Sequence, residues 1–313
     1  MLLITGGRGF VGRNLIESLL TSGFGLTSLV RPGREHISSC EIQLPETLSV
    51  TNLLKSVEKK SKTFDAVIHC AGLAHGKIKN AEYSDYQRTN VELTEKIAEV
   101  AIKLNVKKFV FLSTVGVHGR SAEYKVNEES ALAPYDHYSR SKLEAENLLI
   151  QKFKNAGLES KLVIIRPPLI VGPNPPGSLG KLIRLCSRTI PLPFGAAHNK
   201  RNILSIDNLV DFIKFALKHQ NAYGSFTLAD DETLSTRDIV AIIRGSLGKR
   251  KMLFSIPKKL FKSILRLIKK PHIYEQLFGD LAISNSRAKS IGWTPIVSSN
   301  ESIKIAAKSH SGN

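Results

Sequence analysis

Cysteines are scarce in this chain, and no cluster of metal-binding residues is present. Only three cysteines, Cys40, Cys70 and Cys186, occur in 313 residues, and no Cys-x-x-Cys pair is found. Scattered cysteines in odd number argue against a disulfide-stapled scaffold and against the common zinc spacings, and they are typical of a reducing compartment. We therefore expect a cytoplasmic protein without a metal ion.

Long apolar runs are missing as well. Although 42% of the residues are hydrophobic, no uninterrupted stretch approaches the roughly 20 residues that cross a bilayer. The chain opens with Met-Leu-Leu-Ile-Thr-Gly, which predicts a short strand entering a glycine turn rather than a signal peptide. We expect no transmembrane segment.

Acidic residues are few compared with basic ones. Lysine and arginine number 45 against 27 aspartates and glutamates, which gives a net charge of +18. Such an excess favours anionic partners such as nucleotides, acidic lipid headgroups or nucleic acid. No helix-turn-helix, zinc-finger or RNP signature is present, so we expect no nucleic-acid partner. The alternative is a lysine-rich surface that only faces solvent.

The first half of the chain alternates short apolar runs with longer amphipathic stretches. We expect strands at 2–5, 26–30, 66–71, 108–113 and 162–166, and helices at 10–22, 90–104 and 139–156. Continuous apolar strands separated by helices predict a parallel sheet that is covered on both faces. The fold class is therefore α/β, with a doubly wound Rossmann sheet.

A passage rich in proline and glycine begins after Arg166 and interrupts this alternation. We therefore divide the chain into a dinucleotide-binding domain and a smaller C-terminal cap that binds the substrate. The first comprises residues 1–168 plus about 199–230, and the cap comprises about 169–198 and 231–313. The polar tail beyond about residue 300 is expected to fray.

Three glycines, Gly6, Gly9 and Gly12, follow the first expected strand and open a helix. Glycine permits a tight turn, leaves room for a pyrophosphate and lets the helix pack on the strand. The helix N-terminus offers backbone N–H groups to phosphates. We predict a dinucleotide site here that also includes Phe10 and Val11; the alternative is an ordinary glycine-rich turn.

Arginines stand where an NAD site usually has an acidic residue. Arg31 and Arg34 follow the second expected strand, and Arg8 lies in the glycine loop. An acidic side chain binds the ribose 2′-hydroxyl of NAD, whereas guanidinium groups suit the 2′-phosphate of NADP. The sequence favours NADP(H) and leaves NAD(H) open. Alternatively, these arginines only contribute to a basic surface.

Tyr138 and Lys142 are four residues apart, so on a helix they share one face. A nearby ammonium and a positive nicotinamide ring would lower the tyrosine pKa and prepare the phenol for proton transfer. Thr114 ends an expected strand where ligands bind in parallel sheets, so we expect its hydroxyl to contact the same substrate oxygen. Ser113 is the competing hydroxyl, and an exposed helix pair is the alternative for the tyrosine and lysine.

Two histidines flank the end of the strand expected at 66–71. His69 lies inside this strand, and we interpret it as a packed histidine. His75 follows the strand end, so we place it in the substrate site. Asn90 begins the next helical stretch, and we expect it to cap or brace that helix.

Together these segments resemble the extended short-chain dehydrogenase/reductases, in the branch of UDP-glucose 4-epimerases and nucleotide-sugar reductases. The matching segments are TGGRGFVG at 5–12, DAVIHCA at 65–71, FVFLST at 109–114, YSRSK at 138–142 and RPPLIVGP at 166–173. The resemblance implies that the catalytic hydroxyl, phenol and ammonium belong to Thr114, Tyr138 and Lys142. It also implies a set of residues along the cofactor, namely Ala71, Arg166, Pro167 and Leu169.

A finer likeness concerns bacterial reductases that convert UDP-4-keto-6-deoxy-N-acetylglucosamine to UDP-N-acetylquinovosamine for surface polysaccharide. It rests on the segments 71–76, 191–195, 199–203 and 208–211. The likeness implies that Arg201 contacts the UDP diphosphate, and we add Asn174 to the substrate site. The expected activity is NADP(H)-dependent reduction of a C4 ketone on a UDP-linked sugar, by a homodimer.

Departures from the family pattern keep alternatives open. His118-Gly119 replaces the Tyr-Gly that epimerases commonly carry, and no acidic ribose partner is found. The second candidate is a UDP-hexose or UDP-N-acetylhexosamine 4-epimerase with tightly bound NAD. A candidate of another class is a non-catalytic NADPH-binding protein.

The stretch from Lys258 to Lys270 is basic and amphipathic. Such a helix can lie on an anionic membrane, so peripheral membrane contact stays open. The alternative is a cap helix that buries its leucine, isoleucine and phenylalanine face.

Overall fold

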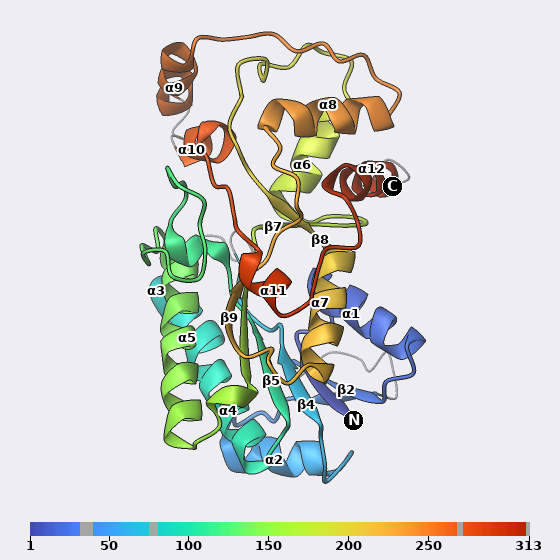
Figure 1. The fold of residues 1–313 in the computed structure, drawn as a ribbon, viewed down its shortest axis with the longest axis vertical. Coiled ribbons are helices and arrows are strands. Elements are labelled where there is room, and N and C mark those ends of the chain that lie inside the picture. The colour runs from blue at the N-terminus through green and yellow to red at the C-terminus, as the bar shows by residue number, and fades with distance from the viewer. Residues whose placement is uncertain (32–39, 75–80, 268–271, 311–313) are drawn as a thin grey trace. The chain divides into compact units, whose positions relative to one another are not determined.

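The computed structural model describes residues 1–31, 40–74, 81–267 and 272–310, which form two compact units (Figure 1). Unit 1 comprises Met1–Val117, Pro134–Arg166 and Val210–Phe226, and unit 2 comprises His118–Ala133, Pro167–Leu209 and Thr227–Asn313. From the sequence we expected residues 199–209, 227–230 and 118–133 in the dinucleotide-binding part, whereas the structure groups them with unit 2. The segment 118–133 belongs to unit 2 because its backbone bonds to a distant segment, as in Ala122 N–H to Asp280 O at 2.8 Å.

Unit 1 is built on a seven-stranded sheet with the order β3-β2-β1-β4-β5-β6-β9. The strands are β1 Leu2–Thr5, β2 Leu26–Val30, β3 Glu41–Gln43, β4 Ala66–His69, β5 Lys108–Leu112, β6 Leu162–Arg166 and β9 Gly224–Thr227. The strands from β3 to β6 pair in parallel. This is the doubly wound order of dinucleotide-binding sheets, as the sequence predicted.

Helices of unit 1 cover the sheet and connect its strands. They are α1 Phe10–Thr21, α2 Val50–Glu58, α3 Tyr83–Tyr86, the π-helix η1 Gln87–Glu92, α4 Leu93–Lys103, the 3₁₀ turns η2 Val115–His118 and η3 Glu159–Lys161, and α5 His137–Asn155. The helix α7, Ile206–Lys218, runs from unit 2 into unit 1. It lies beside α1, where Lys214 Nζ donates to Ser22 Oγ at 2.7 Å (Figure 1).

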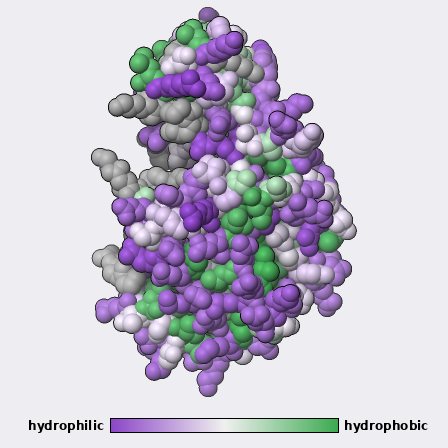
Figure 2. Space-filling view, turned by 90° about the vertical axis from the view of Figure 1, so that its left-hand side faces the viewer, coloured by the Kyte–Doolittle hydropathy of each residue, from purple (hydrophilic) through white to green (hydrophobic). Residues whose placement is uncertain are grey.

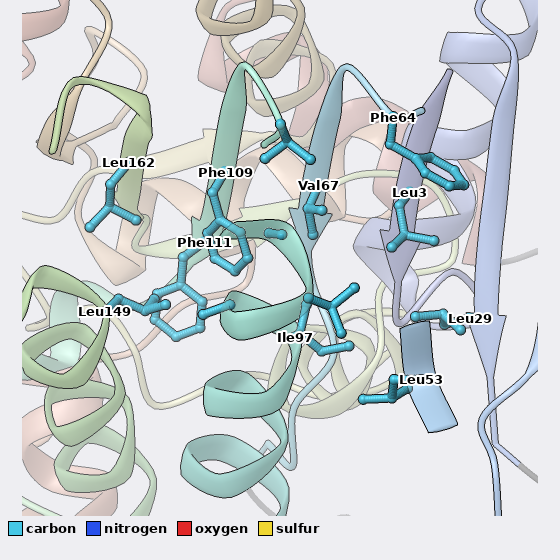
Figure 3. Packing of buried hydrophobic residues seen from close by; sticks show 14 of the residues in the cluster. Leu3, Leu29, Leu53, Phe64, Val67, Ile97, Phe109, Phe111, Leu149 and Leu162 are labelled. Atoms are coloured by element: carbon cyan, nitrogen blue, oxygen red, sulfur yellow. The ribbon is translucent and has the colours of Figure 1, made fainter. Parts of the chain in front are cut away.

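The main core of unit 1 lies between the sheet and the helices α2, α4 and α5 (Figure 3). The strands β1, β4, β5 and β6 are largely apolar, and nearly all of their residues are buried because helices cover the sheet. Fully buried members of this core include Leu3, Leu53, Val67, Ile97, Phe109, Phe111 and Leu149. This packing fixes α5, which carries Tyr138 and Lys142, against the sheet.

Unit 2 contains a short parallel pair of strands and a set of helices. They are β7 Leu169–Val171, β8 Ile203–Ser205, α6 Gly177–Cys186, α8 Thr236–Ser246, α9 Lys258–Leu267, α10 His272–Phe278, α11 Ser286–Ser290 and α12 Ser299–His310. The expectation of a frayed tail was wrong. In α12, Ile303, Ala306 and Ala307 are buried in a core shared with α6 and α8.

Candidate active site

A groove of about 400 Å³ lies at the carboxyl ends of β1, β2 and β4, entirely within unit 1. Its walls are the glycine turn after β1, the end of β2, the loop after β4, and residues of η1 and α4. The lining residues that the sequence predicted are Gly6, Gly9, Arg31 and Ala71. Parallel α/β sheets bind ligands at this edge.

At two positions of the turn, only glycine fits, because a side chain would collide with neighbouring backbone atoms. Gly6 has φ +75°, and a Cβ there would lie 2.6 Å from Ala71 N. A Cβ at Gly12 would lie 2.2 Å from Gly6 O. Because Gly9 caps α1 without a side-chain hydrogen bond, the first amides of the helix can serve an anionic group. The cradle therefore fits the pyrophosphate of a dinucleotide. Phe10 and Val11 begin α1 and are half-buried.

Gly12→Ala should distort this turn. We expect overpacking to lower the free energy of unfolding by about 1–3 kcal/mol. Loss of one hydrogen bond to a charged phosphate should weaken dinucleotide binding by roughly tenfold or more. Fluorescence titration with NADH and NADPH, together with chemical unfolding, measures both effects. Gly25→Ala is the matched control, since no atom lies within 4 Å of a Cβ there; equal behaviour of the two variants would contradict the assignment.

The helix α5 begins where Asp136 accepts a hydrogen bond from Ser139 N–H at 2.8 Å. This cap places Tyr138 in the first turn, where it is half-buried. Burial raises the pKa of Tyr138 above its usual value, and the charges of Asp136, Tyr135 and Tyr86 raise it further. From the sequence we expected a lowered pKa; the direction is the opposite because burial and the neighbouring acidic groups all disfavour the phenolate. The phenol therefore holds its proton at neutral pH.

One helical turn later, Lys142 reaches from α5 to the sheet. Its Nζ donates to Leu112 O at 2.8 Å and lies 4.5 Å from the centre of the Phe111 ring. A Cβ at Gly72 would lie 3.3 Å from this Nζ, so the ammonium borders the loop that lines the groove. Burial lowers the pKa of Lys142 to about 8. The lysine thus stands beside the dinucleotide groove and still carries a proton near neutral pH.

The two candidate hydroxyls after β5 have different surroundings. Ser113 is buried and donates to the carboxylate of Glu146. Thr114 is half-buried, and its Oγ1 accepts from Gly116 N–H at 3.1 Å, which leaves the hydroxyl proton as a donor. A Cβ at Gly116 would lie 3.3 Å from Thr114 Oγ1 and 3.4 Å from Ser139 Cβ. Gly116 therefore lies between Thr114 and Ser139, which follows Tyr138 in the first turn of α5.

A buried ion pair fixes α5 to the end of β6. Arg166 Nη2 lies 2.6 Å from Glu146 Oε2, and the two side chains are 5% and 0% exposed. Arg166 Nε also donates to the same carboxylate, at 3.1 Å. The resemblance assigned Arg166 to the cofactor, but its guanidinium points to Glu146. The ion pair holds the helix that carries Tyr138 to the end of β6, and the cofactor role of Arg166 stays a prediction.

Asn90 has a larger part than the sequence indicated. It lies in the π-helix η1 and is fully buried. Its Oδ1 accepts a hydrogen bond from Leu73 N–H at 2.6 Å, and its Nδ2 donates to Leu73 O at 3.1 Å. Its Nδ2 also donates to Ser141 Oγ at 2.9 Å. Asn90 therefore ties the groove loop after β4 to α5. A π-helical turn is common at functional sites, but the sequence pattern does not reveal one.

His69 is a packed histidine, as expected. Its Nδ1 lies 2.6 Å from Thr5 Oγ1, and its Nε2 lies 2.8 Å from Thr94 Oγ1. Because the Thr94 hydroxyl donates to Asn90 O at 2.6 Å, we assign the ring proton to Nε2. Burial, aided by the charge of Lys142, lowers the pKa of His69 to about 3.

This neutral histidine predicts a loss of stability in acid. The unfolded chain binds a proton at its ordinary pKa near about 6.5, whereas the folded chain does not until about pH 3. The free energy of unfolding should therefore fall as the pH decreases through this window, by on the order of 1.4 kcal/mol per pH unit. Urea unfolding from pH 7 to pH 5 measures the slope. In His69→Gln, unfolding should take up one proton fewer, so the free energy of unfolding should fall less steeply with decreasing pH. An unchanged slope would contradict the assignment.

The basic residues near the groove divide into three cases. Arg8 lines the groove and pairs with Glu41 of β3 through two bonds, Nη2–Oε2 at 2.8 Å and Nε–Oε1 at 3.0 Å. Arg31 lines the groove and is exposed. Arg34 and His75 lie outside the described residues. Glu41 was not predicted near the groove because it lies on the neighbouring strand β3 and not at the end of β2.

The remaining predicted residues belong to unit 2. Arg201 donates to three backbone carbonyls, those of Gly279 (2.9 Å), Arg120 (3.0 Å) and Glu275 (3.1 Å). Asn174 is exposed with φ +49°, and its N–H donates to Ser309 Oγ at 2.9 Å. Unit 2 also holds two residues assigned to the cofactor, Pro167, which is buried, and Leu169, which is 43% exposed. Their binding roles stay predictions.

A known family accounts for this arrangement of cradle, tyrosine and lysine. The sequence profile of the NAD-dependent epimerase/dehydratase family matches residues 2–229. The chain belongs to this family. A UDP-glucose 4-epimerase of Vibrio cholerae is 34% identical over 98% of this chain and 94% of its own length. The N-acetyl-alpha-D-glucosaminyl-diphospho-ditrans,octacis-undecaprenol 4-epimerase of Escherichia coli O157:H7 is 28% identical over 79% of this chain and 72% of its own length.

Solved structures share the fold of this epimerase/dehydratase family member. A UDP-glucuronic acid 4-epimerase from Bacillus cereus matches with a TM-score of 0.76 and 20% identity, over 99% of this chain and 98% of that one. A UDP-glucose 4-epimerase from Thermotoga maritima gives 0.77 and 19%, over the same shares. No group of three metal-binding side chains occurs among the described residues. Within the same residues no helix is long and apolar enough to span a membrane.

Proposed function

We propose that the protein uses NAD(H) or NADP(H) to interconvert a hydroxyl and a ketone at C4 of a UDP-linked hexose or N-acetylhexosamine. The observation that carries this proposal is the placement of Tyr138 and Lys142 on one face of α5, with the lysine ammonium against the wall of the glycine-lined groove. Membership of the family supports the nicotinamide chemistry. The two curated relatives named above, both 4-epimerases by name, support the sugar position.

In this proposal, Tyr138, Thr114 and Lys142 each have a separate role in the reaction. A nicotinamide held in the groove supplies a hydride acceptor or donor. Tyr138 transfers the proton at the sugar O4, and its raised pKa suits the donation to a developing alkoxide. Thr114 donates a hydrogen bond to the same oxygen. Lys142 stabilises the phenolate that remains on Tyr138 after proton transfer.

Two net reactions share this step. Epimerisation is supported by the curated relatives, and reduction of a UDP-4-keto-6-deoxy-N-acetylhexosamine is supported by the sequence resemblance and by the protonated Tyr138. An epimerase should equilibrate C4 epimers without added NADPH and should be purified with NAD bound. A reductase should consume one NADPH per ketone. Dinucleotide binding without turnover on any UDP-sugar or polyprenol-linked sugar would favour the non-catalytic alternative.

The choice between NAD and NADP depends, in our proposal, on the Arg8–Glu41 pair. Glu41 neutralises the arginine that would otherwise bind a 2′-phosphate. Glu41→Gln should therefore raise the affinity for NADPH relative to NADH by roughly tenfold, since it removes a carboxylate and leaves the Arg8 guanidinium to bind the 2′-phosphate. The ratio of the two dissociation constants, measured by fluorescence titration, is the readout. The exposed acid Glu17 on α1 offers a control, Glu17→Gln; an equal shift in both variants would contradict the proposal.

A cytoplasmic location and a homodimer also belong to the proposal. The helix α5 carries Ile150, which is 44% exposed and suits a helix-to-helix contact between two copies. Light scattering of the purified protein tests the dimer, and a monomeric mass at micromolar concentration would reject it.

A further inference from the structure

One segment of unit 2 concentrates the positive charge of the protein. Between Asp238 and Glu275 the sequence has ten lysines and arginines and no acidic residue. These ten charges are more than half of the net charge of +18. Arg244 is buried, but the exposed cations of the described part, such as Lys259, Lys262 and Arg266, have no acidic neighbour in this segment and give it a positive field.

Only part of the apolar stripe of α9 is buried. Phe261 and Leu265 are 8% and 6% exposed, and the Phe261 ring packs edge-on against Phe278 at 5.0 Å. Leu260 and Leu267, however, are 53% and 85% exposed. These two leucines are seven residues apart and share one edge of the helix. The packed-helix alternative from the sequence therefore accounts for one half of the stripe and leaves the other half facing solvent.

Cations line the side of α9 next to this exposed edge. Lys259, Lys262 and Arg266 are all exposed. At 100° per residue they lie about 80–160° from the leucine edge, with the small Ser263 between them. A helix with leucines on one edge and lysines and arginines on the adjoining edge is suited to lie in the headgroup region of a membrane.

A second element repeats the same combination. The chains around Ile190–Leu192 and Met252–Phe254 pair through Leu192 N–H to Met252 O and Phe254 N–H to Leu192 O, both at 3.0 Å. The fully buried Arg244 holds both chains by donating to carbonyls of each, at 2.9 Å to Arg188 and 3.2 Å to Met252. The paired chains are thus a rigid platform.

This platform presents apolar and basic side chains together. Ile190, Met252 and Phe254 are 48%, 38% and 45% exposed. The exposed cations on the same chains are Arg188, Arg250 and Lys251. Three residues then connect Phe254 to the start of α9. Figure 2 looks onto the side that carries α9 and shows hydrophobic side chains beside strongly hydrophilic ones at the upper end.

We propose that α9 and this platform, which we call the basic cap surface, dock unit 2 onto an anionic lipid bilayer. Leu260, Leu267 and Phe254 enter the boundary between headgroups and acyl chains, while the lysines and arginines contact lipid phosphates. A nucleic acid would use the cations but offers nothing to the exposed leucines. A bilayer with acidic headgroups satisfies both kinds of side chain.

Flotation of the full-length protein with vesicles tests the proposal. At low salt the protein should float with vesicles of phosphatidylglycerol and phosphatidylcholine, and roughly tenfold less with pure phosphatidylcholine. Leu260→Gln/Leu267→Gln should lower the partition coefficient on anionic vesicles by about tenfold or more. Ile296→Gln is the matched control, since Ile296 is an exposed hydrophobic of unit 2 (66%) outside this surface; it should bind as the wild type does.

Other outcomes overturn the proposal. Binding that ignores the two leucines and is equally strong on heparin would make the surface a general polyanion site. A change of oligomeric state in the leucine variant, with vesicle binding retained, would assign the leucines to a second copy of the chain. Turnover of a water-soluble UDP-sugar should be the same in the leucine variant and the wild type, so failure of the docking is distinguishable from failure of the proposed activity.

Discussion

Tyr138→Phe should reduce turnover of the UDP-sugar by about 100- to 10,000-fold, the usual contribution of a positioned acid or base. The variant keeps the aromatic ring and removes only the hydroxyl. Because the glycine cradle and Lys142 do not depend on that hydroxyl, the affinity for the dinucleotide and the midpoint of thermal unfolding should stay within error of the wild type. Steady-state kinetics, dinucleotide titration and thermal unfolding together measure this.

Tyr124→Phe is the control for the loss of a phenol elsewhere. Tyr124 is 84% exposed and lies in unit 2, so its hydroxyl has no role in the proposed chemistry. The control should turn over as the wild type does. Wild-type turnover in Tyr138→Phe would remove the tyrosine from the mechanism, whereas an equal loss in both variants would indicate an unspecific effect.

The second large effect concerns the scaffold that holds α5. Glu146→Gln keeps the shape of the side chain but removes the carboxylate that balances the buried Arg166. An uncompensated charge in a site this dry lowers the free energy of unfolding by about 3–5 kcal/mol. Chemical unfolding measures the loss. The double variant Glu146→Met/Arg166→Met should recover most of it, since no buried charge is then left.

The exposed pair between α4 and α5 supplies the control for this prediction. Glu99 lies 2.5 Å from Lys152, and the two side chains are 36% and 26% exposed. Glu99→Gln should cost less than about 1 kcal/mol because solvent screens this pair. A loss no larger in Glu146→Gln than in Glu99→Gln would show that the buried pair does not anchor the helix.

Five of the seven strands and the doubly wound class could be predicted from the sequence because their signal is local, whereas the short strands β3 and β9 were not expected. Apolar strands, the glycine turn and the amphipathic helices each follow from residues that are neighbours in the chain. The helix α12, where the sequence predicted a frayed tail, has a weak local signal: serines and lysines outnumber its buried Ile303, Ala306 and Ala307. These few side chains stabilise the helix because they pack against α6 and α8, which are distant in the sequence.

The candidate site was predictable in its residue types and not in its contacts. Nothing local distinguishes Ser113 from Thr114, since the difference comes from Glu146, which lies 33 residues away. The proposed effect of Glu41 on the choice of cofactor depends on β3 lying beside β2, which no neighbouring residue in the chain reveals. The direction of the Tyr138 pKa also depends on burial, which the four-residue spacing to Lys142 does not reveal.

The most direct test of the central claim is NMR of the sugar product. Wild type and Tyr138→Phe are incubated with a panel of UDP-hexoses, UDP-N-acetylhexosamines and UDP-4-keto-sugars, with and without NADH or NADPH, and the C4 configuration is read from the proton couplings. The account predicts a change at C4 with the wild type and none with the variant, although both bind the dinucleotide. A change at another carbon, or equal conversion by both proteins, would contradict it.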